Sequence, residues 1–164
     1  MDSLTELFEK YRNYRNVEFE FILKNVTKER FYAIKSYLET TKIYATEINT
    51  VDKFIGDNVR ITDDEIAVRK TRKDKIDYSD FYVNIKLESP VENCIINNSK
   101  VLYTRTKKRI RYSEKYIYID LTYVYESDSY EIEIEIDPLL SLCHSSKHII
   151  KKCMMHLHSF GANI

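Results

Sequence analysis

Several features that usually indicate a function are missing from this sequence of 164 residues. Lys plus Arg and Asp plus Glu both number 26, so the net charge is zero and overall charge identifies neither a nucleic-acid nor a membrane partner. No apolar run approaches the roughly 20 residues that a transmembrane helix needs, so no membrane partner is expected. The segment MDSLTELFEK at the start is acidic and amphipathic, unlike a signal peptide.

Cysteine, glycine, proline and tryptophan are also scarce. Cys94, Cys143 and Cys153 are odd in number and show no Cys-x-x-Cys spacing, which excludes a disulfide framework and predicts reduced thiols in an intracellular protein. Glycine and proline occur 2 times each and tryptophan is absent. No internal repeat or low-complexity linker divides the chain, so its length predicts one domain over residues 1–164.

What is present is mostly the alternating pattern of β-strands, with helical patterns near the two ends. Helices are predicted over 3–14 and 27–39, with Ser3 and Thr27 as N-caps, and another opening at Asp137 and Pro138. Strands are predicted over 17–24, 42–50, 57–62, 65–71, 81–88, 101–112, 115–125 and 129–136. This order favours a mainly β (α+β) fold, an eight-stranded antiparallel barrel with flanking helices and room for one small ligand.

Charge is sorted by strand. Glutamates alternate with apolar residues in the first and last predicted strands, VEFEFIL and YEIEIEI, where they are Glu18, Glu20, Glu131, Glu133 and Glu135. The segment TRTKKRIRYS places a row of cations on one face, which are Arg105, Lys107, Arg109 and Arg111. A solvated face explains one such strand. Like charges on one face destabilise a sheet unless something offsets them, so three strands of this kind favour a barrel with a polar interior.

The residue types in these rows point to a chemistry. Carboxylates without histidine or cysteine form a hard oxygen site that suits Mg²⁺ or Mn²⁺ better than Zn²⁺. Arginine binds phosphate through a bidentate fork and lysine binds it as a point charge. A metal and basic residues around a phosphate chain are the equipment of phosphoryl transfer.

Four segments carry a resemblance to a known family, namely VEFEFILKN, KKRIRYS (107–113), IDLTYV (119–124) and YEIEIEI. Their order and spacing resemble those of the metal-dependent RNA 5′-triphosphatases of mRNA capping, within the triphosphate tunnel metalloenzymes. The likeness is greatest to the triphosphatase domain of large DNA virus (mimivirus-like) capping enzymes. It implies an eight-stranded antiparallel tunnel that removes the γ-phosphate of triphosphate-ended RNA in the first step of cap formation, with Mn²⁺ or Mg²⁺ as cofactor.

The resemblance also implies roles for single residues. The implied metal ligands are Glu18, Glu20 and Glu135 directly, with Glu131 and Glu133 acting through water. The implied phosphate contacts are Lys107, Arg109 and Arg111, with Arg60 on the opposite side. Glu88 would orient the attacking water, and Asp120 and Thr122 would brace either the basic strand or the water network. The resemblance assigns no role to Arg69, Lys70 and Arg105.

The resemblance implies three partners: a 5′-triphosphate RNA end, nucleoside triphosphates, and a guanylyltransferase on the same or a separate chain. This sequence shows no guanylyltransferase lysine motif, so a second capping activity is not expected within it. If the protein is viral, its implied location is the host cytoplasm, a viral factory or the virion. Two alternatives stay open: a tunnel phosphohydrolase acting on a small triphosphate or polyphosphate, and a non-catalytic capping subunit that binds RNA or phosphate. The basic run RKTRKDK (69–75) fits either a solvated strand end or a contact with RNA phosphates.

Overall fold

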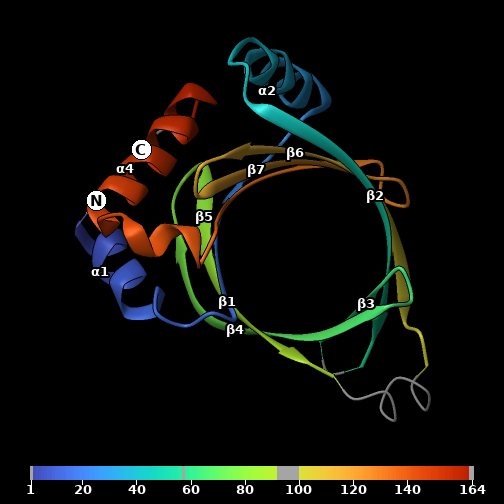
Figure 1. The fold of residues 1–164 in the computed structure, drawn as a ribbon. Helices are drawn as coiled ribbons and strands as arrows, with labels where there is room; N and C mark the ends of the chain where they lie inside the picture. Colours follow the sequence, from blue (N-terminus) through green and yellow to red (C-terminus); the bar gives the residue numbers. More distant parts are fainter. Residues whose placement is uncertain (1, 57, 92–99, 163–164) are drawn as a thin grey trace.

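The computed structural model describes residues 2–56, 58–91 and 100–162. Its centre is a closed barrel in the order β1-β5-β4-β3-β2-β6-β7-β8, seen along its axis in Figure 1. The strands are β1 (Val17–Leu23), β2 (Tyr44–Ile55), β3 (Val59–Thr62), β4 (Ile66–Asp77), β5 (Phe81–Pro90), β6 (Tyr103–Glu114), β7 (Ile117–Val124) and β8 (Ser129–Ile136). Every neighbouring pair is antiparallel, so the predicted barrel is confirmed.

Barrel closure joins the two acidic strands. β1 pairs with β8, which places Glu20 opposite Glu135 and Ile22 opposite Glu133. On its other side β1 pairs with β5, where Glu20 lies opposite Asn84. The carboxylates of the first and last strands therefore meet on one wall, as the sequence predicts.

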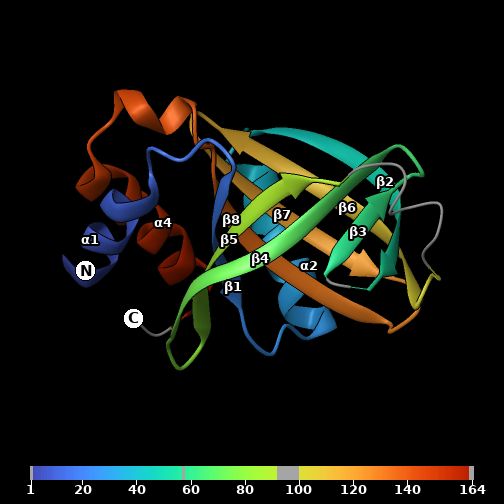
Figure 2. The same cartoon turned by 90° about the horizontal axis from the view of Figure 1, so that it is seen from below.

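The hydrophobic core lies outside the barrel, between its wall and the helices α1 (Asp2–Tyr11), α2 (Lys28–Thr40) and α4 (Ser146–Ser159) (Figures 1 and 2). On β8, Ile132, Ile134 and Ile136 are at most 1% exposed and face this core. The helices contribute their apolar faces, including Phe31, Ile34, Leu38, Ile149, Ile150, Cys153 and Leu157. Because the apolar faces of β1, β5, β7 and β8 point outward to this core, their interior faces are left for polar side chains.

The helices differ from the sequence prediction at two places. α1 begins at Asp2, so Ser3 lies within the helix instead of capping it. After β8 the chain forms a short 3-10 helix, η1 (Leu140–Cys143), and only then α4. The single helix predicted to open at Asp137 is therefore wrong. The Asp137 carboxylate does accept the backbone N–H of both Leu139 and Leu140 at 2.8 Å, as an N-cap does, but the backbone is extended at His144, and Ser145 caps a new helix by accepting the backbone N–H of His148 at 3.3 Å.

The Thr27 cap of α2 is confirmed. Its hydroxyl accepts the backbone N–H of Arg30 at 3.2 Å, so it satisfies a donor that the first turn leaves free. Within the described residues, no helix is both long and apolar enough to cross a membrane. Cys143 and Cys153 are free thiols, and Cys94 lies outside the described residues.

Two strands are longer than predicted. β2 runs to Ile55 and β4 to Asp77, whereas the sequence predicts ends near 50 and 71. β2 pairs with β6 over its whole length, and β4 pairs with β5, with a register shift between Arg72 and Asp74. The basic run 69–75 is therefore part of a strand. Hydrogen bonds to neighbouring strands extend these elements through polar sequence that has little strand signal of its own.

Replacing Ile134 by alanine tests the position of the core. Ile134 is 0% exposed between the barrel wall and the helices, so Ile134→Ala should lower the free energy of unfolding by about 2–5 kcal/mol. Urea denaturation measures this. The control Val101→Ala, at a residue 42% exposed, should change it by no more than about 0.5 kcal/mol. A similar small change in both variants would contradict an external core.

Candidate active site

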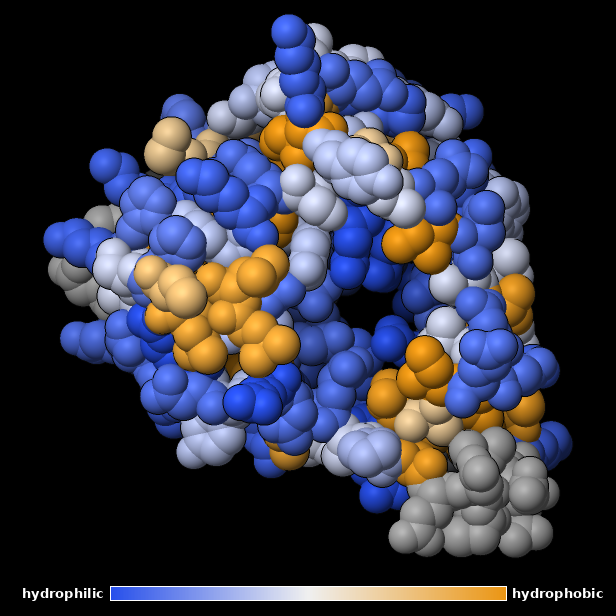
Figure 3. Space-filling model, viewed as in Figure 1, coloured by the Kyte–Doolittle hydropathy of each residue, from blue (hydrophilic) through white to orange (hydrophobic). Residues whose placement is uncertain are grey.

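The inward faces of the strands enclose a cavity of about 470 Å³. Figure 3 shows an opening in the middle of the molecule with hydrophilic residues around it. Its lining consists of acidic, basic and a few uncharged residues, which are Glu18, Glu20, Phe54, Asn58, Arg60, Lys70, Lys86, Glu88, Tyr103, Arg105, Lys107, Arg109, Arg111, Glu131, Glu133 and Glu135. The predicted metal ligands and phosphate contacts therefore share one space.

A buried aspartate on β7 holds the basic row of β6 in place. Asp120 is 1% exposed, and the strand register sets it opposite Arg111. It accepts Nε of Arg111 at 2.8 Å and Nη2 at 2.6 Å, and Nη1 of Arg109 lies 2.9 Å from it. The Nε of Arg109 also donates to Thr122 Oγ1 at 3.2 Å. Asp120 and Thr122 thus fix the planes of both guanidinium groups, in the bracing position that the resemblance implies.

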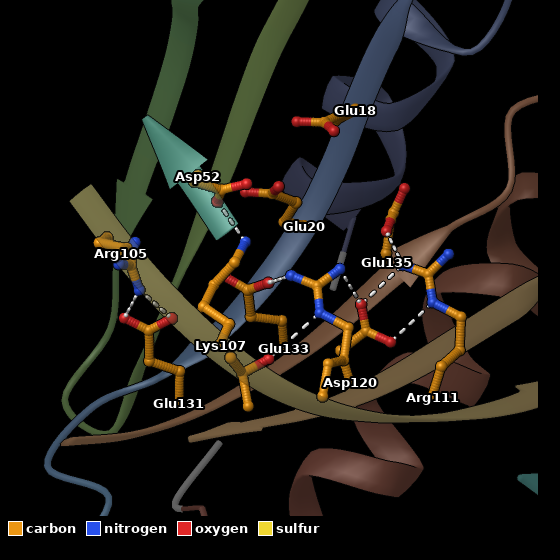
Figure 4. Close-up of polar contacts among 12 residues, drawn as sticks. Glu18, Glu20, Asp52, Arg105, Lys107, Arg111, Asp120, Glu131, Glu133 and Glu135 are labelled. Atoms are coloured by element: carbon orange, nitrogen blue, oxygen red, sulfur yellow. Dashed lines mark hydrogen bonds and ion pairs between the residues drawn. The ribbon is translucent and has the colours of Figure 1, made fainter. Parts of the chain in front are cut away.

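The glutamates of β8 reach this row over the single intervening strand β7 (Figure 4). An Arg105 guanidinium nitrogen lies 2.8 Å from Glu131, and an Arg111 nitrogen lies 2.9 Å from Glu135. The separation between Arg109 and Glu133 is longer, at 4.0 Å. Arg105, to which the resemblance assigns no role, therefore pairs with β8 in the same way as Arg111, in the row where the sequence pattern places it.

The two glutamates of β1 pair with lysines from β4 and β5. Lys70 Nζ lies 2.7 Å from both Glu18 and Glu88, and Lys86 Nζ lies 2.6 Å from Glu20. Arg60 approaches Glu88 at 3.7 Å. The sequence leaves Lys70 unassigned, but its place on the inward face of β4 puts it inside the cavity. Arg69, the adjacent residue, is not among the residues that line the cavity.

Asp52 is a site residue that the sequence does not reveal. It is 1% exposed on β2, forms an ion pair with Lys107, and accepts the Thr62 hydroxyl at 2.8 Å. Burial lowers the pKa of Lys107 below its usual value, although Asp52 acts in the opposite direction. As a lone acidic residue in TVDKFI, Asp52 belongs to no row that could mark it. Lys86 is missed for a similar reason, because it shares its strand face with a glutamate and an asparagine.

Burial, with a smaller effect of neighbouring carboxylates, raises two pKa values on the acidic wall. Burial first, and then the Glu133 charge, raise the pKa of Glu20 to about 8. Burial raises the pKa of Glu135 to about 7 against the opposing effect of Arg111, with Glu18 adding to the rise. Burial would also raise the pKa of Glu18, but Lys70 outweighs it and leaves that pKa below its usual value. Burial and neighbouring carboxylates therefore favour the protonated forms of Glu20 and Glu135.

The donor chemistry of this wall fits a hard divalent cation, which prefers carboxylate oxygens. A cation would also relieve the repulsion that raises the pKa of Glu20 and Glu135. In the arrangement seen here the carboxylates turn toward lysine and arginine, and within residues 2–56, 58–91 and 100–162 no group of three or more Asp, Glu, His or Cys is gathered closely enough to hold a metal. Binding a metal would therefore require Glu18 and Glu20 to exchange their lysine partners for the cation.

Comparison with known proteins establishes the fold. No protein-family model matches the sequence, and no curated protein sequence matches it either. Among solved structures, the RNA triphosphatase Pct1 of S. pombe, in complex with the Spt5 CTD, superposes with a TM-score of 0.71 at 16% identity, over 97% of this chain and 91% of that one. The RNA triphosphatase domain of the mimivirus mRNA capping enzyme gives a TM-score of 0.67 at 16% identity, over 98% of this chain and 97% of that one.

This chain has the fold of these two structures, a closed eight-stranded antiparallel barrel flanked by helices. Both structures are matched over nearly their whole length, so the helices as well as the barrel take part in the likeness. At this level of identity the comparison supports the architecture alone. The chemistry of the site is inferred from the residues described above.

The raised carboxyl pKa values predict how stability depends on pH. The pKa of Glu20 is about 8 in the folded protein against an ordinary value of 4.5, so the unfolded chain ionises first and stability falls as pH rises between these values. In EDTA, the melting temperature should fall from pH 6.5 to 8, above the range in which His156 titrates.

Two variants make this prediction specific. Glu20→Gln should make the decline shallower, because only Glu135, with a pKa of about 7, then remains of the two carboxyl groups with raised pKa values. Glu126→Gln is the control: Thr106 holds the pKa of Glu126 below its usual value of 4.5 and Glu126 lies outside the cavity lining, so its contribution is lost only as pH falls below that value. Parallel curves for wild type and Glu20→Gln would contradict the burial of an ionising Glu20.

Proposed function

We propose that this protein is a metal-dependent RNA 5′-triphosphatase that removes the γ-phosphate from triphosphate-ended RNA and also hydrolyses nucleoside triphosphates. The observation that carries the proposal is the cavity in which Lys107, Arg109 and Arg111 face the glutamates of β1 and β8. The tunnel fold shared with two RNA triphosphatases supports it.

The basic row would bind the phosphate chain. Asp120 occupies one side of the Arg109 and Arg111 guanidinium groups, so their remaining N–H donors point to the cavity. Arg109 is the freest of the row toward β8, because Glu133 lies 4.0 Å away. A triphosphate would replace the β8 glutamates as the partner of these cations, and charge that spreads over its oxygens during transfer would strengthen the contacts.

The acidic wall would hold the metal through Glu18, Glu20 and Glu135, with Glu131 and Glu133 supporting it through water. A bound Mn²⁺ or Mg²⁺ would act as a Lewis acid and offset the negative charge of the phosphates. Substrate binding and metal binding would therefore each replace one partner of the existing ion pairs. The phosphates take the cations of β6 away from the β8 carboxylates, and those carboxylates become available as oxygen donors.

Glu88 is the residue that we assign to the attacking water. It lies on β5 across the cavity from the basic row, and Lys70 and Arg60 hold its carboxylate at 2.7 and 3.7 Å. A carboxylate fixed in this way can accept a hydrogen bond from water and direct its lone pair toward phosphorus. Downstream, the diphosphate RNA end would pass to a guanylyltransferase inside the cell.

A direct assay tests the proposal. Phosphate release from γ-labelled triphosphate RNA is measured with Mn²⁺, with Mg²⁺ and with EDTA, and ATP and inorganic tripolyphosphate are run beside it. We expect release from the RNA with either metal and none in EDTA. Activity that persists in EDTA would overturn the metal assignment, and absence of release from the RNA under all conditions would overturn the function.

Arg109 separates a bidentate contact from a simple positive charge. Arg109→Ala should lower kcat by about 10²–10³-fold, the range seen when one transition-state donor is removed. Arg109→Lys should recover only part of this loss, because a lysine ammonium cannot make the fork contact. Steady-state kinetics on triphosphate RNA measures both. Full activity of the lysine variant would assign Arg109 a point-charge role.

The melting temperature of a Glu133 variant tests whether Glu133 faces the bound cation. Its charge contributes to the raised pKa of Glu20, so Glu133→Gln should raise the melting temperature in EDTA. With Mn²⁺ the same variant should gain less than wild type, because weaker binding stabilises the native state less. Glu47→Gln, on a strand glutamate that pairs with Lys108 outside the cavity, should leave the Mn²⁺ shift unchanged. Equal Mn²⁺ shifts in wild type and Glu133→Gln would remove Glu133 from the metal site.

A further inference from the structure

An aromatic pair stands at one end of the charged cavity. Phe54 closes the inward face of β2, and Tyr103 begins the inward face of β6. The strand register sets the two residues opposite each other. Their rings are nearly parallel, with centroids 4.4 Å apart and an interplanar angle of 10°. Both rings line the cavity, whose other described lining residues are all charged except Asn58.

The pair is not part of the hydrophobic core. Neither ring belongs to the clusters of buried apolar residues found in the described chain, and Tyr103 is 54% exposed. A cross-strand aromatic pair does stabilise a sheet. That role does not require the rings to face a cavity of charged groups. An apolar ring surface that is open to water is stabilised when a further aromatic ring, such as that of a ligand, covers it.

The position of the pair continues the phosphate-binding row. Tyr103 and Arg105 are alternate residues of one strand, so their side chains emerge about 7 Å apart on the same face. Figure 4 shows Arg105 at one end of the row and Arg111 at the other. A phosphate chain bound along this row, with its terminal phosphate at Arg109 and Arg111, would direct the attached nucleoside toward Phe54 and Tyr103.

We propose that Phe54 and Tyr103 form a stacking platform for the nucleobase next to the triphosphate, so that the site favours nucleotide-bearing triphosphates over inorganic ones. The inference rests on the proposed binding of a triphosphate in the cavity. A stacking surface accepts any base because every base has a π-face, so the platform selects for the presence of a base and not for its identity.

Alanine substitution gives the kinetic test. Tyr103→Ala should raise KM for triphosphate RNA and for ATP by about 5- to 100-fold, the range for loss of one base–aromatic stack. KM for inorganic tripolyphosphate should stay at the wild-type value, because that substrate has no base. Tyr103→Phe keeps the ring and should behave like wild type on all three substrates.

The absence of tryptophan from the sequence allows a second test that does not depend on catalysis. Tyr103→Trp introduces a single indole at the platform. Its fluorescence should be quenched by ATP in the presence of Mg²⁺ and unaffected by tripolyphosphate at the same concentration. Tyr14→Trp is the matched control, because Tyr14 is 57% exposed and lies outside the cavity lining. Its fluorescence should respond to neither ligand.

The outcomes separate the platform from the proposed function. If wild type hydrolyses triphosphate RNA but Tyr103→Ala raises KM for tripolyphosphate as much as for ATP, the pair has a structural role only and the platform is wrong. Equal quenching of Tyr103→Trp by ATP and tripolyphosphate would also contradict the platform, even if Tyr103→Ala failed to fold. A wild-type protein that neither binds nor hydrolyses any of these triphosphates would overturn the proposed function and the platform together.

Discussion

The structure depends on matching buried charge within a closed barrel. An unpaired ion in a protein interior costs several kcal/mol, yet six acidic and seven basic side chains line this cavity. They are tolerated because closure sets each row against a row of opposite sign: Glu131, Glu133 and Glu135 face β6, and the glutamates of β1 face lysines of β4 and β5. The hydrophobic core lies outside the barrel and makes a charged interior possible. Apolar residues on the outer wall pack against the helices, so the interior need not supply the burial that stabilises the fold.

The same pairing accounts for how the cavity could work. Its cations and carboxylates are held mostly by one another, and only Asp120 and Asp52 are almost completely buried partners that fix a cation from behind the lining. The arginines of β6 are therefore fixed in position while their inner partners remain exchangeable. A phosphate chain and a divalent cation would each take one member of the existing pairs. The same charged groups stabilise one another within the barrel and would bind the ligands, and a divalent cation would favour the ionised form of Glu20.

Sequence reasoning succeeded where a residue's position in a row carried the information. The period of two in YEIEIEI and TRTKKRIRYS fixed which side chains share a face, and the apolar residues between them fixed which face would be buried. Eight strands, the closed barrel and the inward orientation of both charged rows followed from that alternation. It failed where a residue stood alone or where a neighbour decided the outcome. Asp52 is a single carboxylate whose importance comes from Lys107 on the neighbouring strand, and the helix predicted from Asp137 is interrupted where His144 is extended and Ser145 caps a separate helix.

By itself, then, the sequence determined the faces of the strands and the kind of chemistry they could support, because the side-chain direction of a strand is a local property of its backbone. Only the tertiary structure decided the partners. In the closed barrel β1 lies between β5 and β8, and Lys70 and Lys86 pair with the β1 glutamates. Phe54 stacks on Tyr103 at the end of the cavity. Register between strands far apart in the chain sets these contacts, and it depends on the packing of the whole barrel.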